Sequence, residues 1–170
     1  QQPRGKQRWI DKNFGCWYVQ TTGIWKTVWT EYVPKVSLDS VKMTPNLEDY
    51  SLELEYNVNA PECMMNGDLM VEAVVSFKDM VINRTYTAMM AGHMETKIDM
   101  TVKKADCLEW TVQTWSPEEP NLYDIEFRLV NKGEVLDEVG SYFAMREIRI
   151  DGPNILLNGR PLYQRLILDQ

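Results

Sequence analysis

The chain has 170 residues, of which 44% are hydrophobic and 25% are charged, enough for one well-buried domain but too few for two large ones. Its formal net charge is -7, and an acidic surface repels phosphate backbones, which argues against a nucleic-acid partner. No apolar run reaches the length of a membrane span, so a membrane partner is not expected either.

The first 35 residues are rich in tryptophan but too few to close a sheet of their own. The tryptophans of this segment are Trp9, Trp17, Trp25 and Trp29. Residues 1–7 are polar, contain no signal-peptide core and do not begin with methionine. We therefore expect the chain to begin inside a longer protein.

A two-residue hydrophobic period governs the middle of the chain. In residues 51–59, Leu52, Leu54, Tyr56 and Val58 fall on one face and polar residues fall on the other. This alternation predicts a strand with one face in a core and one in water. Further strands are predicted at 36–43, 68–77, 82–89, 95–102, 109–114, 124–130, 135–143 and 146–150.

Turn signals separate these strands, among them Asn66-Gly67 and Lys132-Gly133. No segment sustains a helical apolar stripe over three turns. The pattern predicts an all-β fold, an immunoglobulin-like antiparallel β-sandwich of two sheets and about seven strands, between about residues 36 and 150. Two sheets are needed, because one sheet would leave an apolar face in water.

Three cysteines, Cys16, Cys63 and Cys107, form neither a disulfide framework nor a zinc pattern. We expect three small buried thiols in a reduced compartment. The sequence does not fix the compartment, and a cytoplasmic location is favoured over the periplasm or secretion. His93 is the only histidine, so a histidine-based triad or metal cluster has almost no material. No metal and no cofactor are predicted.

Four segments carry a family resemblance when they are read in order. They are GIWKTVWTE at 23–31, WSPEEPNLY at 115–123, GSYFAMREI at 140–148 and ILLNGRPLYQR at 155–165. Together they resemble glycoside hydrolase family 2, which includes β-galactosidases, β-glucuronidases and β-mannosidases. The first segment is similar to the end of that family's sugar-binding-type jelly roll, the next two to its immunoglobulin-like domain, and the last to the start of its catalytic (β/α)8 barrel.

The second segment also has a physical interpretation of its own. Pro117 and Pro120 fix their φ angles and force an extended loop, which Trp115 and Tyr123 can hold down at its two ends. The Tyr123 hydroxyl could bond back to the preceding loop, as in the tyrosine corner of such sandwiches. The alternative is that Tyr123 is a plain core residue.

The resemblance implies a division of the chain into three parts. Residues 1–35 would be a remnant of the jelly roll, 36–150 the sandwich, and 151–170 a linker with the first barrel strand. Asn158-Gly159 is a good hairpin turn by its composition. Leu166, Ile167 and Leu168 then resemble the continuously apolar first strand of the barrel, at which the chain is truncated.

Family membership implies a parent enzyme that hydrolyses terminal β-glycosidic bonds with retention, using two carboxylates. The family's acid/base glutamate follows an asparagine, and no Asn-Glu dipeptide occurs here. The fragment is therefore predicted to hold no catalytic residue and to be inactive. In the parent, Asp169 and Gln170 would contact the sugar at the end of the first barrel strand, and Arg165 would pair with a carboxylate on the barrel floor.

Three functions compete for this sequence. The first is a spacer that holds the neighbouring jelly-roll and barrel domains of the same chain, with carbohydrate as the substrate of the parent. The second is a carbohydrate-binding module in which Trp9, Trp17, Trp25 and Trp29 form a platform, since aromatic faces suit sugar rings. The third is a cell-surface adhesion sandwich, against which the barrel-like segment at Asn158-Gly159 argues. Which sugar the parent cleaves depends on barrel loops outside this sequence.

Overall fold

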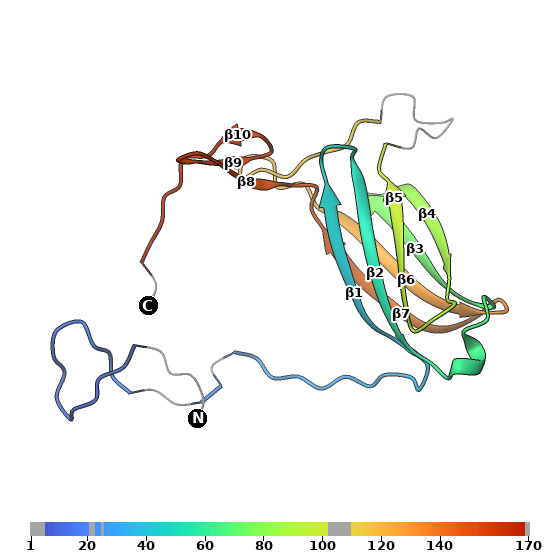
Figure 1. Cartoon of the computed structure of the whole chain (residues 1–170), viewed down its shortest axis with the longest axis horizontal. Helices are drawn as coiled ribbons and strands as arrows, with labels where there is room; N and C mark the ends of the chain where they lie inside the picture. The colour runs from blue at the N-terminus through green and yellow to red at the C-terminus, as the bar shows by residue number, and fades with distance from the viewer. Residues whose placement is uncertain (1–5, 21–22, 25, 102–109, 169–170) are drawn as a thin grey trace. The chain divides into compact units, whose positions relative to one another are not determined.

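The computed structural model describes residues 6–20, 23–24, 26–101 and 110–168. It divides into two compact units, Val33–Tyr163 and the remaining residues, Gln1–Tyr32 with Gln164–Gln170. Over the described residues the fold is all-β, with ten strands and one short 3-10 turn, η1 (Glu62–Met64) (Figure 1). No helix in this part of the chain is long and apolar enough to cross a membrane.

Seven strands of the larger unit form two antiparallel sheets that face one another (Figure 1). The three-stranded sheet has the order β1 (Ser37–Asn46), β2 (Ser51–Asn59), β5 (His93–Asp99). The four-stranded sheet has the order β4 (Met80–Ala88), β3 (Leu69–Phe77), β6 (Tyr123–Asn131), β7 (Glu134–Phe143). The predicted two-sheet sandwich is confirmed.

The core lies between the two sheets and is built from alternate residues of each strand. Leu52, Leu54 and Tyr56 of β2 are fully buried, as are Val71 and Ala73 of β3. The ring of Tyr56 meets that of Phe127 from β6 edge to face, with centroids 6.1 Å apart. Each large apolar side chain buried in this way contributes about 1.5–3 kcal/mol, which is why the period-two pattern specifies the fold.

Turns with positive φ occur where the sequence predicted them. Gly67 has φ +91° before β3, and Lys132 and Gly133 have φ +49° and +88° between β6 and β7. Asn158 and Gly159 have φ +51° and +76°. Two consecutive residues with positive φ match the right-handed twist of the flanking strands, as two-residue hairpins require.

Side chains bridge the two sheets at both of their edges. Where β1 meets β7, the Leu38 amide donates to Asp137 Oδ2 at 2.9 Å. Where β4 meets β5, Asn83 Nδ2 donates to the Asp99 carbonyl at 3.0 Å. The Leu38 amide and the Asp99 carbonyl belong to edge strands, and each of these side-chain bonds gives such a main-chain group a partner.

Two strand predictions need correction. Residues 110–114 contain no strand beyond an isolated bridge from Thr114 to Met145, and residue 109 lies outside the described residues. Side chains satisfy main-chain groups of this segment instead of a neighbouring strand. The Tyr123 hydroxyl bonds to the Gln113 amide and carbonyl, and Asn121 Nδ2 donates to the Thr114 carbonyl.

The second correction concerns residues 146–150, expected as the last strand of the sandwich. A strand is present, β8 (Ile148–Asp151), but it pairs with β9 (Asn154–Leu157) and β10 (Arg160–Pro161) in a separate small sheet. The turn at Gly152, with φ +54°, folds β8 directly onto β9, so β8 does not extend either sandwich sheet.

The cysteines also differ from expectation. Cys16 and Cys63 are free and exposed rather than buried. Cys63 lies in the η1 turn, which has no buried residue, so its position in a surface loop explains the exposure. Cys107 lies outside the described residues.

Among its described residues, the smaller unit is irregular and carries only isolated bridges, Gln7 with Tyr18 and Phe14 with Trp17. Leu166, Ile167 and Leu168 are exposed and form no strand. Their assignment as the first barrel strand stays a prediction, as do the three domain boundaries.

Candidate functional site at the end of the sandwich

Three segments far apart in the sequence meet around the side chain of Asn158. Its Oδ1 accepts a hydrogen bond from the Glu147 amide at 3.0 Å, and its Nδ2 donates to the Trp115 carbonyl at 2.9 Å. The Asn158 amide also donates to the Glu147 carbonyl at 2.9 Å. The turn between β9 and β10 is thereby tied both to the segment that leaves β7 and to the loop that precedes β6.

The loop at Trp115 is held by its own hydrogen bonds as well as by its prolines. The Ser116 amide donates to the Glu119 carbonyl at 2.9 Å, and the Glu119 amide donates to Ser116 Oγ at 3.0 Å. Asn121 Nδ2 donates to the Thr114 carbonyl at 3.0 Å. Pro117 and Pro120 remove two main-chain donors from this loop, so it reaches its compact form with few groups left to satisfy.

Tyr123 is the first residue of β6, and its hydroxyl binds the main chain just before the same loop. Its hydroxyl donates to the Gln113 carbonyl at 3.1 Å and accepts from the Gln113 amide at 2.7 Å, ten residues upstream. The ring is fully buried and stacks on Phe143 with centroids 5.2 Å apart. Burial raises the pKa of Tyr123 to about 12. Both interpretations of Tyr123 are therefore correct, because it is a core residue and also a tyrosine corner.

A groove of about 430 Å³ opens beside this junction. The Arg146 guanidinium lies over the Trp115 ring, 5.0 Å from its centroid, a cation–π arrangement. Leu122 and Tyr142 line the groove and are exposed. The described residues that line the groove include no carboxylate, whereas glycoside hydrolysis with retention uses a pair of acids.

The remaining predicted site residues are Arg165, Asp169 and Gln170. Arg165 is described and exposed, and it belongs to the smaller unit. Asp169 and Gln170 lie outside the described residues. No group of histidine, cysteine, aspartate and glutamate able to hold a metal ion occurs among the residues that the structure describes.

The structure describes three of the four tryptophans in the alternative sugar platform, Trp9, Trp17 and Trp29. Trp9 and Trp17 contact each other with centroids 4.7 Å apart and planes at 72°, so they do not present one flat surface. Trp29 Nε1 donates to Glu31 at 3.3 Å. Trp25 lies outside the described residues.

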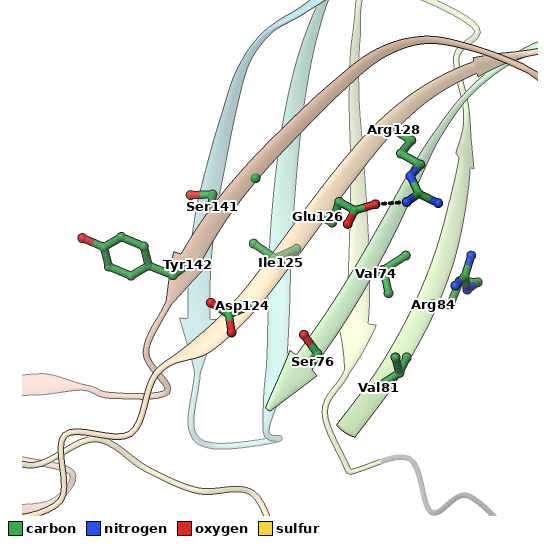
Figure 2. A pocket seen from close by; sticks show the side chains of 11 residues that line it. Val74, Ser76, Val81, Arg84, Asp124, Ile125, Glu126, Arg128, Ser141 and Tyr142 are labelled. Atoms are coloured by element: carbon green, nitrogen blue, oxygen red, sulfur yellow. Dashed lines mark ion pairs between the residues drawn. The ribbon is translucent and has the colours of Figure 1, made fainter. Parts of the chain in front are cut away.

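Sequence reasoning missed a charged network on the outer face of the four-stranded sheet. The side chain of Glu72 is only 7% exposed and is paired with Arg84 and, at 3.8 Å, with Arg128. The Tyr86 hydroxyl donates to Glu72 at 2.7 Å, and this bond is the main reason why the pKa of Glu72 lies below its ordinary value. Arg128 is also paired with Glu126 (Figure 2). A third carboxylate, Glu138, is paired with Arg128 as well.

The comparison with known families assigns the chain. Residues 36–146 match the model of the family described as glycosyl hydrolases family 2, which is more than half of the sequence. The chain belongs to glycosyl hydrolase family 2.

Individual relatives agree with this assignment. The chain is 24% identical to a β-galactosidase of Photobacterium profundum, over 93% of this chain and 16% of that protein. It is 28% identical to a β-galactosidase of Klebsiella pneumoniae, over 85% of this chain and 14% of that protein. The chain thus spans less than one fifth of the length of these relatives.

A solved structure supports the fold. A β-glucuronidase of Ruminococcus gnavus aligns with a TM-score of 0.54 and 20% sequence identity, over 78% of this chain and 19% of that one. The chain is accordingly homologous to the immunoglobulin-like domain of these family 2 enzymes, and its described residues contain no catalytic barrel.

Proposed function

We propose that this domain acts as a spacer in a larger retaining β-glycosidase, where it fixes the positions of the domains before and after it. The observation that carries the proposal is the Asn158 side chain, which joins the Trp115 loop, the exit from β7 and the turn after β9. A rigid connection at this point sets the direction in which the following chain leaves the sandwich.

The domain itself is proposed to be non-catalytic. Retaining hydrolysis needs two carboxyl groups about 5–5.5 Å apart, one as acid/base and one as nucleophile. We expect the 170-residue chain to show no turnover of aryl β-galactosides or aryl β-glucuronides, measured by release of nitrophenol. Release above a buffer blank that scales with protein concentration would contradict this expectation.

The spacer role is tested in the full-length parent enzyme with two matched asparagine variants. Asn158→Ala removes both side-chain bonds at the junction, whereas Asn154→Ala alters an exposed residue in the same small sheet. We expect Asn158→Ala to lower kcat and to speed proteolysis between the domains, and Asn154→Ala to change neither. Equal behaviour of the two variants would remove the spacer role of the junction.

The residues proposed for the parent's substrate site are Asp169 and Gln170, which would contact the sugar, and Arg165, which would pair with a carboxylate on the barrel floor. Their support is the resemblance of residues 155–165 to the start of the family barrel, whose active sites lie at the carboxyl ends of the strands. In the parent, Asp169→Ala should lower kcat/KM while leaving the circular dichroism and the melting temperature unchanged. An unaltered rate would withdraw Asp169 from the site.

A further inference from the structure

The register of the four-stranded sheet arranges its outward side chains in rows that cross β4, β3, β6 and β7. One row contains Tyr86, Glu72, Arg128 and Glu138, and the next contains Arg84, Val74, Glu126 and Gly140. The third contains Val81, Ser76, Asp124 and Tyr142. Side chains directly opposite on neighbouring strands lie within reach of one another.

The charges in these rows are not equally balanced. Arg84 and Arg128 are both engaged by carboxylates of the network, namely Glu72, Glu126 and Glu138. Asp124, by contrast, lies between Ser76 and Tyr142 and has no ion-pair partner among the residues that the structure describes (Figure 2). One carboxylate on this face therefore has its hydrogen-bonding capacity available for a ligand.

The surface is hollowed at this position. A depression of about 650 Å³ is lined by Ser76, Arg84, Asp124, Gly140 and Tyr142, among others. The side chain of Tyr142 is exposed, at 65%. Gly140 has no side chain to fill the hollow. The space above it is open, because no atom lies within 4 Å of the position that a Cβ would take. The hollow thus has an aromatic wall, an open floor and both donors and acceptors on its rim.

We propose that this hollow binds a neutral pyranose sugar, with one ring face on Tyr142 and hydroxyl groups bonded to Asp124. A carboxylate can accept bonds from two adjacent hydroxyls, while the Ser76 hydroxyl, directly opposite Asp124, supplies a donor. A small organic cation would also suit an aromatic ring beside a carboxylate, but it would make no use of the Ser76 hydroxyl that lies opposite Asp124. An anionic sugar is opposed by Asp124. This inference goes beyond the spacer role and does not depend on it.

The experiment is a titration of the 170-residue chain with methyl β-D-galactopyranoside, followed by backbone amide shifts in NMR spectra. We expect saturable binding with Kd on the order of 1 mM, typical of a small ligand on an open site. The largest shifts should fall at Ser76, Asp124 and Tyr142. Absence of saturation up to roughly 50 mM sugar would overturn the proposal.

Variants assign the binding to this hollow. Tyr142→Ala and Asp124→Ala should each weaken binding by about tenfold or more, whereas Tyr142→Phe keeps the ring and should weaken it less than about threefold. Tyr163→Ala, an exposed tyrosine outside the hollow, should leave Kd unchanged. Loss of binding in Trp9→Ala with none in Tyr142→Ala would place the sugar elsewhere.

Two further ligands test the ligand class. Methyl β-D-glucuronide should bind more weakly than the neutral sugar, because its carboxylate meets Asp124. Choline chloride should not displace the sugar at equal concentration. Displacement by choline, or tighter binding of the glucuronide, would overturn the assignment to a neutral pyranose, and neither result would bear on the spacer function.

Discussion

The side-chain amide of Asn158 donates a hydrogen bond to the main-chain carbonyl of Trp115, 43 residues earlier, with an N–O distance of 2.9 Å. The same side chain accepts from the Glu147 amide. Asn158 also occupies a positive-φ turn position, which asparagine tolerates better than most residues. One residue thus shapes a hairpin and connects that hairpin to two other segments.

Removal of this side chain is expected to destabilise the domain in two separable ways. Asn158→Gly deletes both hydrogen bonds and should lower the free energy of unfolding by about 1–3 kcal/mol. Asn158→Ala should cost about 1 kcal/mol more, because alanine strains the positive φ. Urea unfolding followed by fluorescence measures both values. If glycine proves as stable as wild type, the two side-chain bonds contribute nothing.

Loss of the Tyr123 hydroxyl is expected to cost about 1–3 kcal/mol of unfolding free energy. Tyr123→Phe keeps the buried ring but leaves the Gln113 amide and carbonyl without this partner. Tyr142→Phe on the neighbouring strand is the control, since its ring is exposed, and should change stability by less than about 0.5 kcal/mol. Similar unfolding midpoints for the two variants would contradict the corner's role.

The same hydroxyl predicts an alkaline pH dependence. Its pKa in the folded protein is about 12, against an ordinary value of 10.0. Because the folded-state pKa is raised, the contribution of the neutral hydroxyl is complete below pH 10 and is lost as the pH rises towards 12. The stability difference between wild type and Tyr123→Phe should therefore shrink across this window. A difference that stays constant would count against the assignment.

Acid should weaken the domain through Glu72. The hydrogen bond from Tyr86 lowers the pKa of Glu72, with help from Arg84 and Arg128. A lowered folded-state pKa gives stability that is present above the ordinary glutamate value of 4.5 and is lost as the pH falls through the folded-state pKa. Glu72→Gln should therefore be less stable than wild type at pH 7, by about 1–3 kcal/mol.

The control for this acid effect is Glu134→Gln, at an exposed position at the start of β7. Urea unfolding at a series of pH values should show the gap between wild type and Glu72→Gln closing as the pH falls below the ordinary glutamate pKa. The Glu134→Gln curve should run parallel to wild type. A gap for Glu72→Gln that does not vary with pH would show that the carboxylate charge is immaterial.

Two thiols should react in the folded protein. Cys16 and Cys63 are exposed, so a chromogenic disulfide reagent should modify both at rates close to those of a small free thiol. Cys16→Ser and Cys63→Ser should each remove one fast equivalent. Reaction that begins only after denaturant is added would mean that these thiols are buried.

Much of the sandwich could be predicted from sequence because one physical rule governs it. Every strand with a clean two-residue alternation, such as residues 51–59, was found where the pattern placed it. A strand was also predicted at 109–114, but the main chain of Gln113 bonds to the side chain of Tyr123 rather than to a neighbouring strand. The two-residue alternation indicates which face of a strand is apolar. It does not indicate which group forms hydrogen bonds with the main chain of that segment.

The junction could be predicted only in part. The composition of Asn158-Gly159 indicates a hairpin, and a hairpin is present. The bond from Asn158 to Trp115 joins residues 43 positions apart, and no local pattern carries that information. Glu72 alternates with apolar neighbours and so has the pattern of a solvent-facing residue. Its burial depends on Tyr86, Arg84 and Arg128, which come from two other strands.

The side-chain bonds at the two seams of the sandwich have a consequence for how the protein behaves at high concentration. An open sheet margin with unpaired amides and carbonyls can recruit a strand from another molecule and start a fibre. Here the Asp137 carboxylate accepts a hydrogen bond from the Leu38 amide, and the Asn83 side chain donates one to the Asp99 carbonyl. Intermolecular strand addition at either place must first break a bond that the folded monomer already makes.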